Sequence, residues 1–415
     1  MAVLVNAMPA PSPHVPAVAS STATGSSQDA RLAAFAAELD QLKAETMAQV
    51  GEPDARYIVR LLWAIRGMET VARLMLLSAP WWPSWWLGVL VLCVSKVLQS
   101  GEFAHNVMHG QYDWMNDPRF EGKTHDWDLA CTKEDWRHSH NFLHHHYTNV
   151  LGLDRDFGYG AIRLSADVPW EPRHLIQLPY AIVGALVFEW AIGVYNMELE
   201  RLVTERDAEA KAQVKARIRA LWPNYRAKIG FQVKKDYVLW PLLGAAVSWL
   251  LGAGPLAGAL SVLTGHAMAN VLRNVWNFIV IFCGHFPAGV ATFEQADIQG
   301  ETKGRWYLRQ IMGSVNIQGG FMMQMLTGHL SHQIEHHLFP DMPSRRYVYI
   351  APRVHAICQR YGVRYNSGSL LALWPSVAWR VLRYTLPGGQ CIRQAVTLPG
   401  RAIIDDGVGD QRKAA

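Results

Sequence analysis

The stretch LMLLSAPWWPSWWLGVLVLCVSKVL, residues 74–98, contains a single formally charged side chain, Lys96. A membrane-spanning helix needs roughly 20 mainly apolar residues, and this stretch is long enough to supply them. Residues 237–283 form a second apolar block, in which Arg273 is the only formal charge. The sequence GAGP at 252–255 interrupts that block where two antiparallel helices would turn. The two blocks predict an all-α integral membrane protein.

The rest of the 415-residue chain divides by composition. Residues 1–30 are rich in Ala, Pro and Ser, which predicts a disordered N-terminal arm. Residues 31–56 have the pattern of an amphipathic helix. Residues 57–383 are expected to form the membrane domain, and residues 384–415 are expected to form a C-terminal tail.

Charge and cysteine usage exclude several classes of function. The net charge is +5, but the sequence has no basic stripe with interleaved aromatic residues, so nucleic acid is not an expected partner. Lys and Arg are instead in excess in residues 201–235, which is typical of a cytoplasmic loop. The five cysteines are widely separated and form no CxxC pair, which argues against a zinc ribbon, an iron–sulfur cluster or disulfides.

The apolar pattern predicts about four transmembrane helices, at residues 60–80, 84–103, 237–253 and 256–280. Residues 178–197 are also apolar but contain Glu189, and an acid in mid-bilayer costs roughly 2.5 kcal/mol or more. We therefore expect this segment to lie in the membrane plane or to be buried in protein. The basic loop 201–235 then lies on the same side as the histidines described next. That side is expected to carry a cytoplasmic, histidine-rich helical cap built from residues 105–235 and 284–383.

The histidines are concentrated in a few places. Of the 17, eight lie between residues 105 and 146, and four lie between residues 329 and 337. They form three groups, HNVMH at 105–109, HSHNFLHHHYTN at 138–149 and HLSHQIEHHLFP at 329–340. A single histidine is usually a surface or hydrogen-bonded residue. Packing gives no reason for three such groups to recur beside membrane exits.

Imidazole suits iron, zinc and copper, so many neutral histidines around one site indicate a transition metal. Structural zinc usually takes four ligands, often cysteines. Eight or more histidines without paired cysteines therefore indicate two metal ions in a histidine-dominated site. Iron is the leading candidate.

The segments HNVMH, WRHSHNFLHHHYTN and HQIEHHLFPDMPSRRY resemble, in this order, the three histidine boxes of the membrane fatty acid desaturases. The resemblance is closest to the bacterial acyl desaturases related to front-end desaturases. It runs from about residue 84 to residue 383 and includes LGLDRDFGYG at 151–160 and IAPRVHAICQRYGVRY at 350–365. One box alone would be moderately specific, whereas three boxes in order are highly specific.

The resemblance implies a di-iron centre that uses O2 and two electrons to remove two hydrogens from adjacent methylenes of a fatty acyl chain. The implied ligands are His105 and His109 in the first box, His140, His144 and His145 in the second, His285 in CGHFP, and His336 and His337 in the third. Many members begin the third box with a histidine where this chain has Gln333, whereas the front-end branch has glutamine there. The adjacent His332 is a second candidate, and both are kept.

Other polar residues lie close to the boxes. Asp154, Asp156 and Glu335 are candidates to hold the outer ring nitrogen of ligand histidines, with solvated loop acids as the alternative. The histidines that are expected behind the ligands or at the surface are His138, His146 and His329.

The predicted activity is desaturation of a fatty acyl-CoA or acyl-lipid substrate, with membrane lipid around the protein. The sequence has no HPGG haem motif, no GxGxxG fingerprint and no ferredoxin cysteine spacing. We therefore expect a separate electron donor, a ferredoxin or cytochrome-type protein with an NAD(P)H reductase. The alternatives are a di-iron fatty acid or alkane hydroxylase of the same superfamily and, more remotely, a metal transporter, whose ligands would lie near the bilayer midplane.

Overall fold

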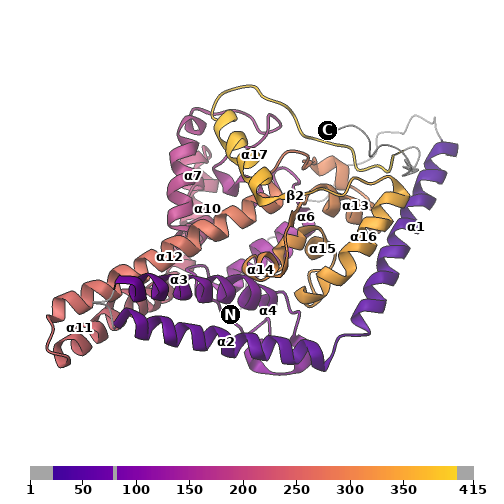
Figure 1. Ribbon diagram of the computed structural model, residues 1–415. Helices are drawn as coiled ribbons and strands as arrows, with labels where there is room; N and C mark the ends of the chain where they lie inside the picture. Colours follow the sequence, from indigo (N-terminus) through magenta and orange to yellow (C-terminus); the bar gives the residue numbers. More distant parts are fainter. Residues whose placement is uncertain (1–21, 78–81, 400–415) are drawn as a thin grey trace, which may run out of the picture.

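The computed structural model describes residues 22–77 and 82–399, and these are mainly helical (Figure 1). The described residues also contain one two-stranded parallel sheet, in which β1 (Asn316–Gln318) pairs with β2 (Ser367–Ser369). Residues 1–21 of the predicted N-terminal arm and residues 400–415 of the predicted tail lie outside the described part of the chain.

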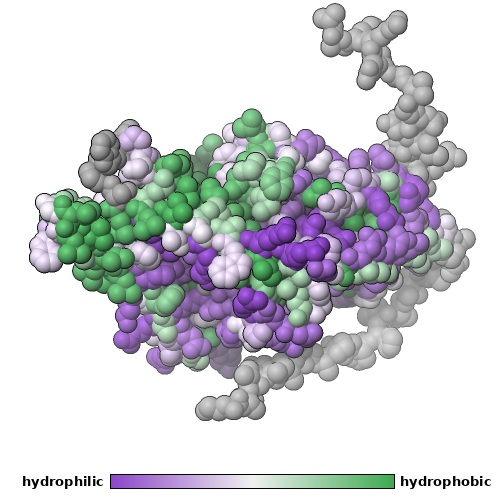
Figure 2. All heavy atoms as spheres, turned by 60° about the horizontal axis from the view of Figure 1, so that its bottom comes forward, coloured by the Kyte–Doolittle hydropathy of each residue, from purple (hydrophilic) through white to green (hydrophobic). Residues whose placement is uncertain are grey.

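Helix α2 (Glu52–Leu77) and the apolar helices α3 (Trp82–Leu98), α11 (Trp240–Leu250) and α12 (Pro255–His285) extend from one end of the molecule (Figure 1). Figure 2 shows hydrophobic residues gathered on the surface at that end. Helices α11 and α12 approach each other closely, because a Cβ atom on Gly244 would lie 2.6 Å from the Gly258 carbonyl oxygen. Small residues at such a crossing are typical of helix pairs in membranes.

Two helical stretches among the described residues, Pro83–Met108 and Pro255–His285, are long and apolar enough to cross a membrane. A third candidate results if the bent pair Pro172–Leu186 and Phe188–Asn196 is counted as one broken span. The predicted spans at 60–80 and 237–253 are not among these candidates. The structure thus has two or three candidate spans, and the count of four stays a prediction.

Shorter helices build the rest of the molecule, which we call the helical body (residues 109–239 and 286–399). Its main helices are α5 (Lys133–Trp136), α6 (His145–Tyr147), α7 (Gln177–Leu186), α8 (Phe188–Asn196), α9 (Arg201–Thr204), α10 (Ala208–Gln232), α13 (Lys303–Met312), α14 (Phe321–Leu326), α15 (Gln333–Leu338), α16 (Tyr347–Tyr361) and α17 (Leu370–Arg383). The short helix α4 (Asn106–Met108) continues the chain from α3 towards this body.

Helix α1 (Thr22–Met47) differs from the sequence prediction at both ends. The predicted amphipathic helix covered residues 31–56, but α2 already begins at Glu52, so that range contains parts of two helices. Phe35 and Leu39 of α1 are fully buried in a core shared with α13 and α16. At the start of α1, Gln28 donates a hydrogen bond to the Leu398 carbonyl oxygen, 2.9 Å away. Residues 22–30, which were predicted to be disordered, are helical, and Gln28 contacts the C-terminal segment.

Three π-helical segments interrupt the regular helices, at Gln99–His105, Arg137–His144 and Val233–Leu239. A π-helical turn holds an extra residue, which rotates the side chains that follow it, and such turns are frequent at functional sites. The first two segments carry His105, His140 and His144. The directions of these side chains therefore cannot be read from a spacing of 3.6 residues per turn.

Glu189, which argued against a span at 178–197, has a buried partner. Its carboxylate pairs with the Arg273 guanidinium of α12, and both side chains are almost fully buried. The segment itself is divided at Val187 into α7 and α8, which meet at an angle of 113°. The charge of Glu189 is thus compensated, and the bend prevents a single straight helix.

Lys96, the one charge in the opening stretch, is also paired inside the protein. Its ammonium group lies 2.7 Å from an Asp236 carboxylate oxygen, and Asp236 lies in the third π-helical segment. The other oxygen of Asp236 is 3.3 Å from His266 Nδ1 on α12. Ionisable residues in apolar helices are costly unless they are paired in this way.

We predict that Arg273→Ala lowers the free energy of unfolding by about 3–5 kcal/mol, because it leaves the Glu189 carboxylate buried without a partner. The double variant Arg273→Leu/Glu189→Leu should recover most of this loss, because it removes both charges. Unfolding of the detergent-purified chain as a function of temperature or denaturant measures both effects. A double variant that is as unstable as Arg273→Ala would contradict the explanation.

Candidate metal centre

Eight histidines that are distant in sequence meet in one place. The first two follow α3, where the π-helical segment ends. The next three lie on the second π-helical segment and on α6, one closes α12, and two lie on α15. They are His105, His109, His140, His144, His145, His285, His336 and His337. All eight were predicted as ligands from the sequence.

The structure sorts seven of these histidines into two adjacent groups. The first group is His105, His109, His140 and His336, and the second is His144, His285 and His337. Within each group, one nitrogen from every ring lies within 4.8 Å of the others. His145 lies between the groups, with its ring centroid 4.7 Å from that of His109 and 4.5 Å from that of His337. The geometry fits two neighbouring metal ions.

The donor atoms themselves provide a test of this fit. Several buried ring nitrogens have no hydrogen-bond partner: His109 Nε2, both nitrogens of His145, His285 Nδ1, His336 Nε2 and His337 Nε2. A buried polar atom without a partner is costly and uncommon in folded proteins. A bound cation would satisfy these nitrogens together, and imidazole is a ligand that suits iron.

The outer nitrogens of several of these rings are held by hydrogen bonds. His144 Nδ1 lies 3.0 Å from an Asp154 carboxylate oxygen, and His140 Nδ1 lies 3.2 Å from Asp156. His337 Nδ1 lies 3.0 Å from Gln310 Oε1. Such contacts set the tautomer and orientation of a metal-binding histidine. The predicted contacts of Asp154 and Asp156 with histidines of the second box, His144 and His140, are confirmed.

Glu335 does not take the predicted position beside a histidine. It is fully buried and accepts hydrogen bonds from Asn316 Nδ2 at 2.8 Å and from the Tyr365 hydroxyl at 2.7 Å. Burial raises the pKa of this carboxyl to about 7. Helical geometry explains the difference, because the residue before His336 points away from the face that carries the histidines.

Electrostatics favour neutral imidazoles, the form that binds metal. Burial and the surrounding imidazoles hold the pKa well below the ordinary histidine value for His109, His145, His336 and His337. For His144, burial lowers the pKa, but the carboxylates of Asp154 and Asp156 outweigh this and hold it above the ordinary value. The orienting carboxylates thus also supply negative charge next to the metal groups.

The two candidate metal ligands in the third box, Gln333 and His332, lie in different surroundings. Gln333 lies against the cluster, with its side-chain nitrogen 2.8 Å from His285 Nε2. His332 belongs to neither group, and its Nδ1 lies 3.3 Å from the Ser331 hydroxyl. Of the remaining histidines, His329 is buried against Glu102 at 2.7 Å. His138 and His146, the other two histidines that were expected outside the ligand set, lie exposed at the surface.

Two contacts of the cluster were not predicted from the sequence. Gln310 on α13 holds His337, and the Tyr347 hydroxyl lies 3.4 Å from His336 Nδ1. Tyr347 is the last residue of the segment that resembles the third histidine box. Its position in that segment was a reason to expect it near the histidines. Gln310 lies in a stretch with no motif.

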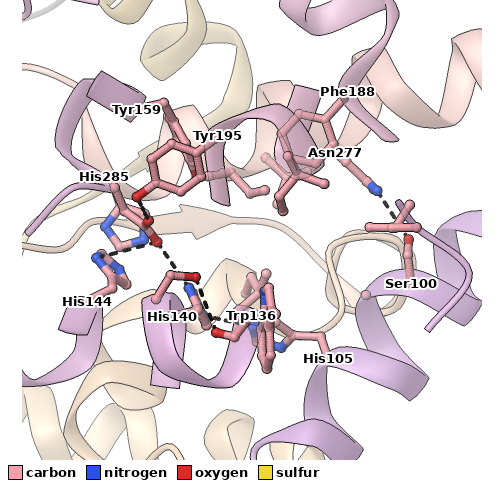
Figure 3. Close-up of a pocket in the computed structure, with 18 of the residues that line it drawn as sticks. Ser100, His105, Trp136, His140, His144, Tyr159, Phe188, Tyr195, Asn277 and His285 are labelled. Atoms are coloured by element: carbon pink, nitrogen blue, oxygen red, sulfur yellow. Dashed lines mark hydrogen bonds and ion pairs between the residues drawn. The ribbon is translucent and has the colours of Figure 1, made fainter. Parts of the chain in front are cut away.

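An apolar cavity, which we call the acyl cavity, opens beside the histidines (Figure 3). His105, His140, His144 and His285 face it from the metal side. Its other walls are mainly aromatic and aliphatic, with Trp136, Tyr159, Phe188, Ile192 and Tyr195 among them. A narrow apolar space beside a metal site suits a hydrocarbon chain.

The apolar helices and the histidine-lined cavity together indicate a membrane protein that acts on an apolar substrate beside a candidate metal site. Comparison with known families makes this specific. Residues 80–369 match the fatty acid desaturase family, and the chain belongs to it. It is accordingly an oxidoreductase that desaturates fatty acids.

Known relatives support the assignment. The chain is 42% identical over 361 residues to the NADPH-dependent stearoyl-CoA 9-desaturase of Mycobacterium tuberculosis, covering 86% of this chain and 81% of the relative. It is 24% identical over 289 residues to the sn-1 linoleoyl-lipid 6-desaturase of Arthrospira platensis, covering 67% of this chain and 72% of the relative. It is 24% identical over 315 residues to fatty acid desaturase 3 of Homo sapiens, covering 74% of this chain and 63% of the relative.

We predict that Asp154→Asn weakens iron binding by roughly 10–100-fold, because it removes the negative charge that orients His144. Titration of the purified apoprotein with ferrous iron, followed by elemental analysis, measures this. Glu134→Gln is the matched control, because this acid lies near the second box with its side chain 69% exposed. Equal iron affinity in the parent chain and Asp154→Asn would refute the role of this carboxylate.

Proposed function

We propose that this chain introduces a double bond into a long-chain fatty acyl-CoA, and that stearoyl-CoA, desaturated at its ninth carbon, is the first substrate to test. The observation that carries the proposal is the pair of histidine groups on one wall of an apolar cavity. The choice of acyl-CoA rests on the relative named as a stearoyl-CoA desaturase, which is 42% identical, compared with 24% for the relative named for a lipid-linked substrate.

The proposal includes a di-iron centre held by the two histidine groups, with His145 between them. When bound, the two iron ions would supply the activation of O2 and the removal of two hydrogens from the acyl chain. No side chain can do this alone, because a saturated methylene offers neither an acidic proton nor an electrophilic carbon. Gln333 is proposed to orient His285, whereas His332 is left out of the proposed ligand set.

The residues around the acyl cavity have three tasks in this proposal. Its aromatic walls exclude water from the reacting methylenes and hold them in place. Asp156 accepts hydrogen bonds from the Tyr195 hydroxyl at 2.5 Å and from His140, so one carboxylate links the cavity wall to the metal side. The hydrocarbon and the histidines are therefore held in a common framework.

The two electrons are proposed to come from a separate protein, a ferredoxin or a cytochrome-type protein with an NAD(P)H reductase. The sequence lacks the haem, flavin and iron–sulfur motifs that a built-in donor would bring. The name of the mycobacterial relative includes dependence on NADPH, which supports NADPH as the first reductant to supply.

Fatty acid analysis of a host that expresses the intact chain should reveal a new unsaturated acid. The same host expressing His144→Ala/His145→Ala should lack it, because one ligand from the second group and the residue between the groups are removed. Gas chromatography with mass spectrometry identifies the product and the bond position. A new alcohol in place of the alkene would favour a hydroxylase, and neither product from an iron-loaded, reduced chain would refute the proposal.

We also propose four spans, with the histidine cluster and residues 201–235 on the cytoplasmic side. In sealed vesicles, single cysteines placed at the exposed positions His138 and Val203 should react with a membrane-impermeant reagent from the same side of the membrane. A cysteine placed at Ala253, in the α11–α12 turn, should react only from the opposite side. Reaction of the first two cysteines from opposite sides would refute this topology.

A further inference from the structure

The acyl cavity shares lining residues with two other cavities. On one side, Trp127 lines both the acyl cavity and an open charged groove, whose cationic side chains include Arg66, Lys133 and Lys228. On another side, four side chains line both the acyl cavity and a second apolar space: Tyr159, Phe188, Ile192 and Tyr195. We call this second space the far chamber.

The far chamber has no charged residue in its lining. Its walls beyond the shared side chains include Ile162, Tyr180, Ala181, Phe278 and Phe282. Burying a charged or phosphate-bearing group there would be costly, whereas a hydrocarbon end would be stabilised. The charged groove is the polar neighbour of the acyl cavity, with five basic side chains and four acids in its lining. Because only the far chamber lacks charge, we expect the methyl end of an acyl chain to point towards it.

Phe188 stands at the boundary between the acyl cavity and the far chamber (Figure 3). Two of its neighbours there are held by other contacts. The Tyr195 hydroxyl donates to Asp156 at 2.5 Å, and the Tyr159 ring stacks on Phe282 with centroids 5.8 Å apart. Phe188 is the first residue of α8, directly after the bend that separates α7 from α8.

Polar contacts from α12 hold that bend in place. The Asn274 side chain accepts a hydrogen bond from the Glu189 backbone N–H at 3.3 Å and donates one to the Leu186 carbonyl oxygen at 3.0 Å. The Glu189 carboxylate pairs with Arg273. The residues on both sides of Phe188 are thus fixed to one helix, which gives the buried ion pair a role in positioning this ring.

We propose that Phe188 closes the methyl end of the acyl cavity and thereby limits the length of the acyl chain, while Glu189, Arg273 and Asn274 act as its positioning residues. The proposal rests on the proposed desaturation of acyl-CoA. The far chamber is the space that a longer chain would occupy once this ring is removed. Another end of the acyl cavity is less suited to a methyl group, because the Asn277 side chain donates there to the Ser100 hydroxyl at 3.1 Å.

The test compares palmitoyl-, stearoyl- and arachidoyl-CoA as substrates in membranes of the expressing host, with the donor system that supports the parent chain. In Phe188→Ala, the ratio of turnover on arachidoyl-CoA to turnover on stearoyl-CoA should rise by about 10-fold or more, because the additional methylenes of arachidoyl-CoA can then enter the far chamber. Phe188→Leu should shift the ratio in the same direction by less. Phe321→Ala is the matched control, since this exposed ring lines neither cavity.

A second substitution refills the far chamber. Gly184 lines it, and a Cβ atom there would meet nothing within 4 Å. Gly184→Leu in the Phe188→Ala background should therefore return the ratio towards the parent value. In the parent background, the same substitution should change the ratio little, because Phe188 already closes the boundary.

The outcomes separate this inference from the proposed function. An unchanged ratio in Phe188→Ala, with normal turnover of stearoyl-CoA, would overturn the role of Phe188 alone. Loss of all turnover in both Phe188 variants would also overturn it, because a residue at the methyl end is not needed for the chemistry. If the iron-loaded parent chain desaturates none of the three substrates, the proposed function fails and this inference fails with it.

Discussion

Several imidazole nitrogens of the histidine cluster are buried without a hydrogen-bond partner, and the packing around the cluster depends on how they are satisfied. His109, His145, His285, His336 and His337 each bury at least one ring nitrogen that has no protein partner. A protein does not keep such atoms together without compensation, because each has lost its hydrogen bonds to water. Two cations in the cluster would provide that compensation. The helix ends that carry the histidines must then meet at one point, which determines how α3, α6, α12 and α15 are arranged.

The same constraint extends outward from the cluster. Each ring that turns one nitrogen inward can use the other for orientation, and Asp154, Asp156 and Gln310 accept these contacts. Asp156 also binds Tyr195, which lines both the acyl cavity and the far chamber. A single carboxylate therefore couples the metal side to the wall that would hold the acyl chain. Changes in the cavity wall and in the cluster are not expected to be independent.

Charges in the apolar helices follow a related rule. Lys96 pairs with Asp236, and Arg273 pairs with Glu189, so the single charge in each of the two apolar blocks has an opposite charge beside it. These pairs join segments that are far apart in sequence. The Glu189 pair lies beside the bend between α7 and α8, where the chain bounds the acyl cavity. Polar residues that look unfavourable in the sequence thus hold the shape of the cavity.

The apolar stretches, the eight histidines and the family could be predicted from the amino-acid sequence, because all of these depend on local composition and spacing. Asp154 and Asp156 could also be predicted as partners of histidines, since both follow the second box closely. The sorting of the histidines into two groups, the place of Glu335, the partner of Glu189 and the boundary at Phe188 required the three-dimensional structure. π-Helical turns, a sharp bend and contacts between distant segments set these features, and no periodic pattern along the chain encodes such contacts.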